Sequence, residues 1–222
     1  TVTEAYRSFR EGKFIVNRTY QRKLVWTLDE KVRLVDSMLR RYPIPLILLF
    51  QTEDHKYEII DGMQRLNAIF GFIENSFPLV DGRFFDVNEF PTAKDLAVQK
   101  VFEPSPSQSK LTRTECATIL DYQLAVTIFT VGDTSDVTDI FGRINSGGKQ
   151  LSAQEQRQAG VVTPFAAFVR SLSSELRGDA SEETVNLADM PVVSIDSPTL
   201  KLGYGVHAEQ TFWCKQGILR TK

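Results

Sequence analysis

The sequence predicts an α+β fold, because short β segments and amphipathic helices alternate in the first half and helices prevail in the second. Residues 14–26 mix β-forming and polar residues. A helix is expected after Thr27, which has Glu30 three positions on, the pattern of a capping box. Residues 44–50 form an apolar run typical of a buried strand, and residues 57–60 are expected to form the next strand. The predicted order is therefore β, α, β, β.

The next segment is predicted to begin with an amphipathic helix. Its apolar residues recur at helical spacing, and they are Leu66, Ile69, Phe70 and Ile73. Residues 77–80 and 83–87 flank Asp81 and Gly82, a pattern that predicts a β-hairpin with a type I′ turn. The composition of residues 103–109 indicates a surface loop.

The second half of the chain is predicted to be mainly helical. Thr112 and Glu115 are expected to cap a short helix, and residues 123–131 are expected to form a strand with Val126 and Ile128 on its apolar face. Three further helices are expected to begin at positions with helix-starting residues, and these are Ser135, Ser152 and Pro164, the last of which begins the longest. The last of these helices is expected to turn Phe168 inward.

The composition limits the possible function classes. Of the 222 residues, 42% are hydrophobic and 24% are charged, as in an ordinary globular protein. The formal net charge of -2 gives no basic field, so tight sequence-independent binding of duplex DNA by this segment alone is not expected. No apolar run is long enough for a membrane span or a signal peptide, which predicts a cytoplasmic protein.

Cysteine and histidine are too scarce for several kinds of site. Cys116 and Cys214 cannot form a disulfide framework, lack metal-binding spacing, and are expected to be packing residues in a reducing compartment. His55 and His207 are the only histidines, which leaves an H-N-H metal nuclease without a ligand set in this chain. The sequence also contains no Walker loop and no pattern of a catalytic triad.

The main candidate for chemistry is Asp61-Gly62-Met63-Gln64-Arg65, at a predicted strand-to-helix junction. Free backbone N–H groups and the positive end of the helix dipole make such a junction suitable for phosphate. Gly62 permits close approach, and Arg65 could grip phosphate oxygens. Gln64 could orient a water or a base edge, while Asp61 could hold hydrated magnesium or an attacking water. The pattern also fits an ordinary polar turn with a surface arginine, so spacing leaves both interpretations open.

A second candidate is Tyr20-Gln21-Arg22, which lies close to Trp26 in the sequence. Aromatic and guanidinium groups together suit base stacking and phosphate contact. The same residues also fit a half-buried edge strand whose aromatic side chains pack in the core.

A third candidate is the end of a predicted helix, where Arg143 and Asn145 precede Gly147 and Gly148. The negative end of a helix dipole repels phosphate. Asn145 and Gly147 therefore fit a helix-capping motif as well as a binding site, and both interpretations stay open.

These segments occur together in one order and spacing over roughly residues 14–160. They comprise residues 20–26, 30–31, 34–39, 43–45, 57–66, 141–148, Leu151 and 155–157. In this combination the chain resembles the ParB-like domains that form the N-terminal half of GmrSD-type restriction systems. The resemblance implies a ParB/sulfiredoxin-like core, with a small mixed sheet and packed helices, followed by a more helical C-terminal part.

The resemblance also implies nucleoside triphosphate binding and hydrolysis at a D-G-Q-Q-R sequence. On this basis the catalytic residues are Asp61, Gln64 and Arg65. The residues expected to bind nucleotide in the same pocket are Tyr20, Gln21, Arg22, Gly62, Arg143 and Asn145. Met63 departs from the family, which usually has Gln there. A side chain that touches nucleotide would make this change matter, whereas a buried one would make Met a harmless filler.

The resemblance further implies Mg²⁺, a nucleoside triphosphate as substrate or effector, and an H-N-H-type nuclease domain or subunit that cleaves DNA. DNA would be reached through the full-length enzyme, and a homodimer is possible. The expected division is a nucleotide-binding core in residues 1–110, elements completing it in 111–176, and an extension in 177–222 towards a further domain. Two alternatives remain: a non-hydrolysing ParB-like DNA-recognition or nucleotide-switch module, and a nuclease with Asp61 as metal ligand.

Overall fold

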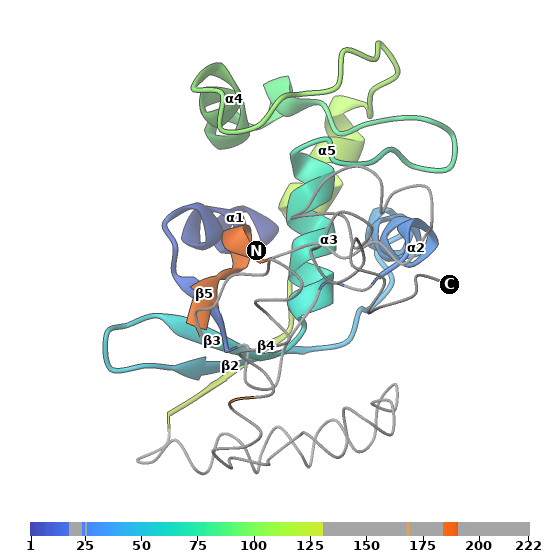
Figure 1. Ribbon diagram of the computed structural model, residues 1–222. Coiled ribbons are helices and arrows are strands. Elements are labelled where there is room, and N and C mark those ends of the chain that lie inside the picture. The colour runs from blue at the N-terminus through green and yellow to red at the C-terminus, as the bar shows by residue number, and fades with distance from the viewer. Residues whose placement is uncertain (18–23, 25, 131–167, 169–183, 191–222) are drawn as a thin grey trace, which may run out of the picture. The chain divides into compact units, whose positions relative to one another are not determined.

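The computed structural model describes residues 1–17, 24, 26–130, 168 and 184–190 (Figure 1). The chain divides into two compact units. The first contains Thr1–Ile15, Trp26–Phe129 and Asn186–Ala188, and the second contains Val16–Val25, Thr130–Val185 and Asp189–Lys222. The helices predicted from Ser135 and Ser152 lie outside the described residues, as does Cys214. The expected division into a core, its completion and an extension stays a prediction.

The described residues form the α+β fold that the sequence predicts. The α-helices are α1 (Val2–Arg10), α2 (Leu28–Leu39), α3 (Met63–Ile73), α4 (Pro91–Val98) and α5 (Arg113–Leu120). The strands are β1 (Phe14–Asn17), β2 (Ile47–Gln51), β3 (Tyr57–Asp61), β4 (Val126–Phe129) and β5 (Thr184–Asn186). Short 3₁₀ turns cover Val87–Glu89 and Leu187–Asp189.

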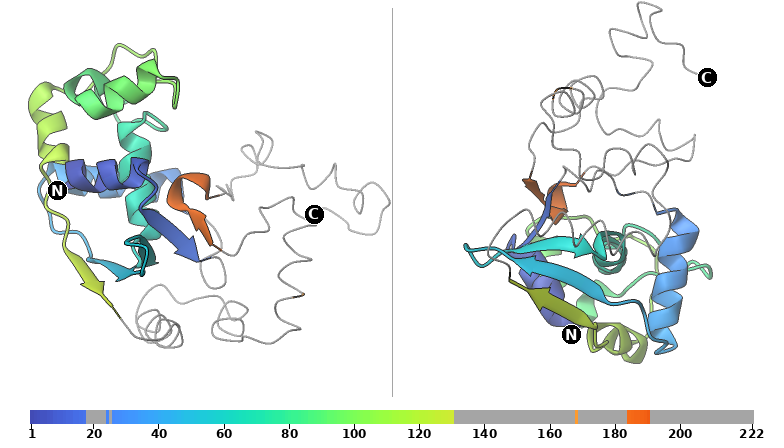
Figure 2. Two further views of the ribbon diagram at one scale, coloured as in Figure 1. Left: turned by 90° about the vertical axis from the view of Figure 1, so that its left-hand side faces the viewer. Right: turned by 90° about the horizontal axis from the view of Figure 1, so that it is seen from below.

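The strands form one mixed sheet in the order β4-β2-β3-β1-β5. Strand β3 pairs antiparallel with β2 and parallel with β1, and β2 also pairs parallel with β4. The helices α1, α3 and α5 lie on the same side of strands β2 and β3 in the views of Figures 1 and 2. Strand β3 is therefore central, and the helix that follows it crosses this side of the sheet.

Capping boxes start three of the helices. At α2 the Thr27 hydroxyl accepts from the Glu30 N–H at 3.3 Å, and the Glu30 carboxylate accepts from the Thr27 N–H at 2.9 Å. The predicted box at Thr112 starts α5 in the same way. Thr1 caps α1, a helix that the sequence analysis missed, as it missed α4, which begins with Pro91 in its first turn.

The predicted hairpin around Gly82 is wrong in its strands and its turn type. The turn closes one residue earlier, because the Gly82 N–H donates to the Leu79 carbonyl at 2.9 Å. Gly82 has a φ of 80° but Asp81 is not left-handed, as a type I′ turn would require. Phe84, on the far side of the turn, pairs with Lys110 in a short parallel bridge.

Aromatic rings from α1 and α3 fill the core above the sheet. Phe9 stacks on Phe70 with ring centroids 4.6 Å apart, and Tyr6 meets Phe70 edge-on at 5.8 Å. Arg10 donates to the Glu74 carboxylate, which also accepts from the Tyr6 hydroxyl at 2.9 Å. Burial raises the pKa of Glu74, against the opposing effect of Arg10. These contacts fix the C-terminal end of α3 against α1.

Two expectations about burial differ from the structure, and a third is confirmed. Val126 and Ile128 are 44% and 50% exposed, because β4 is the last described strand at its edge of the sheet. Phe168 is helical but 62% exposed, not turned inward. Cys116 is fully buried as a packing residue, and burial raises the pKa of its thiol to about 11.

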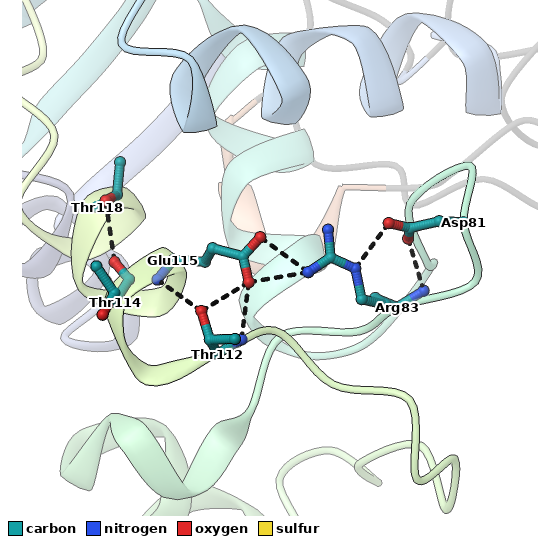
Figure 3. Close-up of polar contacts among 6 residues, drawn as sticks. All are labelled: Asp81, Arg83, Thr112, Thr114, Glu115 and Thr118. Carbon is teal, nitrogen blue, oxygen red and sulfur yellow. Dashed lines mark hydrogen bonds and ion pairs between the residues drawn. The ribbon is translucent and has the colours of Figure 1, made fainter.

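A polar network joins the turn at Gly82 to the start of α5 (Figure 3). The Arg83 guanidinium donates to both carboxylate oxygens of Glu115 at 2.8 Å and to Asp81 at 2.7 Å. Glu115 also accepts from the Thr112 N–H at 2.9 Å. Burial acts to raise the pKa of Glu115, but these hydrogen bonds outweigh it and hold the pKa below its ordinary 4.5.

This network predicts a loss of stability in acid. A carboxylate with a lowered pKa in the folded state stabilises the fold above the unfolded value of 4.5, and the contribution disappears as pH falls through the folded pKa. Glu115→Gln should therefore lower the free energy of unfolding at pH 7 by about 1 kcal/mol. The free energy of unfolding of this variant should also fall less than that of the wild type as the pH drops below 4.5. Urea denaturation at pH 7 and at a series of acid pH values measures both effects.

Glu115→Ala is the matched comparison, because it also removes the capping acceptor of α5. It should be less stable than Glu115→Gln at every pH. An acid decline of the same size in wild type and Glu115→Gln would contradict the proposed role of the ion pair.

Candidate functional site

The predicted motif lies where β3 runs directly into α3. Asp61 is the last residue of β3, Gly62 is the N-cap of α3, and Met63 is its first helical residue. Gly62 has φ 103° and ψ 4°, a left-handed conformation that favours glycine. A Cβ at this position would stand 3.0 Å from Cγ1 of Ile47. Both the backbone conformation and the close contact with Ile47 therefore favour glycine at the junction.

A β-bulge precedes the junction. Leu48 is paired with Asp61 and Leu49 with Ile59, so β3 contains one residue more than β2 at this point, namely Ile60. Bulges bend a strand and change the direction of its side chains, and they are common beside functional sites. The irregular register therefore determines how the end of β3 presents Asp61.

The N-terminal end of α3 is electrostatically suited to an anion. Gly62 has no side chain to cap it, and no side chain of the described residues forms a capping hydrogen bond at this end. The first intrahelical bond runs from the Leu66 N–H to the Gly62 carbonyl at 2.9 Å. The N–H groups of the first turn therefore point along the positive end of the helix dipole. Phosphates bind to such helix ends in many proteins.

Arg65 forms hydrogen bonds with two partners within the fold. Its Nη2 donates to Oδ2 of Asp61 at 2.7 Å and to the carbonyl oxygen of Leu46 at 2.9 Å. The Arg65 side chain is 13% exposed, whereas that of Asp61 is 38% exposed. The Nε of Arg65 is buried and has no hydrogen-bond partner among the residues that the structure describes. The phosphate grip expected for Arg65 thus stays a prediction, and its observed partners favour another role.

Gln64 connects the junction to the segment before α2. Its Oε1 accepts from the Trp26 N–H at 3.3 Å. The structure therefore brings Trp26, which follows the second candidate segment in the sequence, next to the motif. Tyr20, Gln21 and Arg22 lie outside the described residues, as do Arg143 and Asn145. That these residues line the same site stays a prediction.

Met63, the departure from the family pattern, is buried and only 7% exposed. Its side chain contributes to packing at the start of α3. This burial favours the second of the two interpretations left open by the sequence, in which Met63 is an apolar filler.

Leu46 and Ile47 belong to the surroundings of the site, although sequence analysis did not identify them. The register that pairs Leu48 with Asp61 would place Leu46 opposite Met63. Met63 is already part of α3 and does not continue strand β3. The donor to the Leu46 carbonyl is the Arg65 side chain. This contact depends on a sheet register and has no signal in the local sequence.

Within the described residues, no group of three or more His, Cys, Asp and Glu side chains could hold a metal ion. A magnesium ion that arrives with a nucleotide needs less, because it keeps several waters and binds one or two carboxylates together with the phosphates. Asp61, a half-exposed carboxylate beside the helix end, fits that requirement.

Gly62→Ala should destabilise the fold more than Gly82→Ala. Both glycines have a positive φ, but an added Cβ at Gly82 meets nothing within 4 Å, whereas at Gly62 it meets Ile47. Backbone strain alone should cost about 1–3 kcal/mol at either position. The excess at Gly62 measures the close packing of the junction, and thermal melts of both variants test it. Equal losses of stability would contradict this packing.

Met63→Gln should lower the free energy of unfolding, because it places an amide at a buried position. A loss of about 1–3 kcal/mol is expected from burying an unpaired polar group. Met63→Leu keeps an apolar side chain of similar size and should cost less than about 1.5 kcal/mol. Urea denaturation gives both values. A Gln variant as stable as wild type would show that position 63 has a polar partner.

No helix in the described part of the chain is both long and apolar enough to cross a membrane.

Comparison with known proteins identifies the family. The family model described as "GmrSD restriction endonuclease, N-terminal domain" matches residues 2–162, which is well over half of the 222 residues. No curated protein and no solved structure matches the chain. The matched range contains the whole junction, from the bulge in β3 to the first turn of α3. The resemblance inferred from the sequence is confirmed: the chain belongs to the family of GmrSD restriction endonuclease N-terminal domains and is a component of a restriction system.

Proposed function

We propose that this domain binds and hydrolyses a nucleoside triphosphate at the β3–α3 junction. The observation that carries the proposal is the uncapped N-terminal end of α3 beside the half-exposed carboxylate of Asp61. A site of this kind offers N–H donors for phosphate oxygens and an acceptor for a water molecule within one turn of chain.

The phosphates would bind to the backbone N–H groups of the first turn of α3. Hydrogen bonds from neutral backbone donors to an anion are charge-assisted, and the helix dipole strengthens them. Gly62 supports this function because its left-handed backbone lets the chain turn directly from β3 into the helix. Gly62 itself contributes no side chain at the N-cap.

Asp61 would act on water at the reacting phosphate. Its Oδ2 is held by Arg65, while its Oδ1 forms no hydrogen bond with another described residue. Magnesium bound with the nucleotide would neutralise charge on the phosphates, and Asp61 would hold one of the waters around it. Alternatively, the carboxylate would orient the attacking water itself.

Gln64 would help to orient that water. Its carboxamide oxygen is held by the Trp26 N–H, so the side chain is attached to a second segment of the fold. A fixed amide is the type of group that positions an attacking water in several nucleotide hydrolases.

The nucleotide site would control DNA cleavage by an attached or partner nuclease in a prokaryotic defence system against phage. The matching family is by its description the N-terminal domain of a restriction endonuclease. DNA would be bound by the full-length enzyme, since the net charge of -2 gives this chain no basic field.

A second function is favoured by one observation, the ion pair between Asp61 and Arg65. A carboxylate held in this way suits a domain that binds nucleotide and changes conformation without hydrolysing it. Tight binding of GTP or ATP without release of phosphate would support this switch function over hydrolysis.

Asp61→Asn should abolish hydrolysis. Removing a group that acts on the attacking water should lower phosphate release from GTP or ATP with magnesium by about 100-fold or more. Asp36→Asn is the matched control, because Asp36 of α2 forms an ion pair with Arg40, the C-cap of that helix, at the same i,i+4 spacing and at 2.8 Å. The control should turn over like wild type. Equal rates in wild type and Asp61→Asn would contradict the proposal.

A further inference from the structure

We infer that Arg65 is a positioning residue, which holds the Asp61 carboxylate and the start of β2 in place, and that it is not the group that grips the phosphates. The inference rests on the proposed function of the β3–α3 junction. It assigns phosphate recognition to the backbone of α3 and water recognition to Asp61.

The difference in solvent exposure between Arg65 and Asp61 is the first argument for this role. Arg65 is 13% exposed and Asp61 is 38% exposed, so the carboxylate is the open side of the pair. The pair between Arg40 and Asp36 has the same sequence spacing, but there the arginine is 59% exposed. A ligand that approaches from solvent therefore meets Asp61 before the guanidinium of Arg65.

The hydrogen bonds that the Arg65 guanidinium forms are the second argument. A single nitrogen, Nη2, donates to both Asp61 and the Leu46 carbonyl. Leu46 lies just before β2, and β3 ends at Asp61, so the observed donor to the Leu46 carbonyl comes from the Arg65 side chain. Moving the guanidinium towards a phosphate would leave this carbonyl without its donor and Asp61 without its ion pair, which is unfavourable in a partly buried site.

The segment that Arg65 holds is also anchored from its other end. The Tyr122 hydroxyl donates to the Tyr42 carbonyl at 2.6 Å and accepts from the Ile44 N–H at 3.2 Å. The chain between α2 and β2 is thus attached at Tyr122 and at Arg65. A guanidinium fixed between this segment and Asp61 can aim the carboxylate, which is what a positioning residue does.

The test compares affinity for nucleotides of different phosphate number with turnover. Fluorescent analogues of GTP, GDP and GMP are titrated against the whole chain with magnesium, and phosphate release is measured on the same samples. The variants are Arg65→Met, which keeps an unbranched stem, and Arg65→Lys, with Arg40→Met as the control. Replacing a residue that binds the terminal phosphate should lower the ratio of GTP to GDP affinity, whereas replacing a positioning residue should leave this ratio unchanged.

For a positioning residue, Arg65→Met should keep the wild-type ratio of GTP to GDP affinity within about twofold, while kcat falls by about tenfold or more. Arg65→Lys should restore part of kcat, because one nitrogen makes both observed bonds. A merely structural role would not separate kcat from affinity in this way. Arg40→Met should match wild type in both measurements.

Loss of the preference for GTP over GDP in Arg65→Met, with normal circular dichroism, would overturn the inference and leave the proposed function intact. If Arg65→Met fails to fold, the GTP to GDP ratio of the neutral variant Arg65→Gln decides in the same way. Wild type that binds none of the three nucleotides refutes the proposed function and the inference together. Binding without turnover refutes hydrolysis alone, and the affinity ratio still decides the role of Arg65.

Discussion

The structure of the site depends on one constraint, the direct passage of a central strand into a helix through a left-handed glycine. Gly62 has a φ of 103°, and a Cβ there would lie 3.0 Å from Ile47 of the neighbouring strand, a tight contact. This geometry brings the carboxylate at the end of β3 next to the positive end of α3. The bulge at Ile60 adjusts the register just before the turn. The backbone path from β3 to α3 therefore sets the positions of the polar residues of the motif.

The contacts around this junction connect segments that are far apart in the sequence. Arg65 reaches the start of β2 through the Leu46 carbonyl, and Gln64 reaches the segment before α2 through the Trp26 N–H. The family match covers all of these segments. A side chain of the motif can therefore be required for the integrity of the site without touching a ligand. This distinction matters for Arg65, whose observed partners belong to the protein itself.

Sequence analysis predicted those features that depend on local chemistry. Capping boxes and apolar spacing located α2, α3 and α5, and the strand before Gly62 placed the motif at a helix start. The hairpin at Gly82 was wrong because tertiary pairing of Phe84 with Lys110 replaced the predicted strands. The ion pair of Arg65 with Asp61 follows helical spacing, but its bond to Leu46 requires a sheet register that no local pattern contains. The exposure of Val126 likewise depends on the strand order.

Nuclear magnetic resonance of the backbone amides measures the central claim most directly. A non-hydrolysable triphosphate with magnesium is titrated into the labelled chain, and the amide signals of Met63, Gln64 and Arg65 are followed. Phosphate at the N-terminal end of α3 should shift these signals in proportion to the bound fraction, because the N–H groups of the first turn become its donors. Nucleotide binding that leaves these three amides unchanged and shifts signals elsewhere in the chain would contradict a phosphate site at the β3–α3 junction.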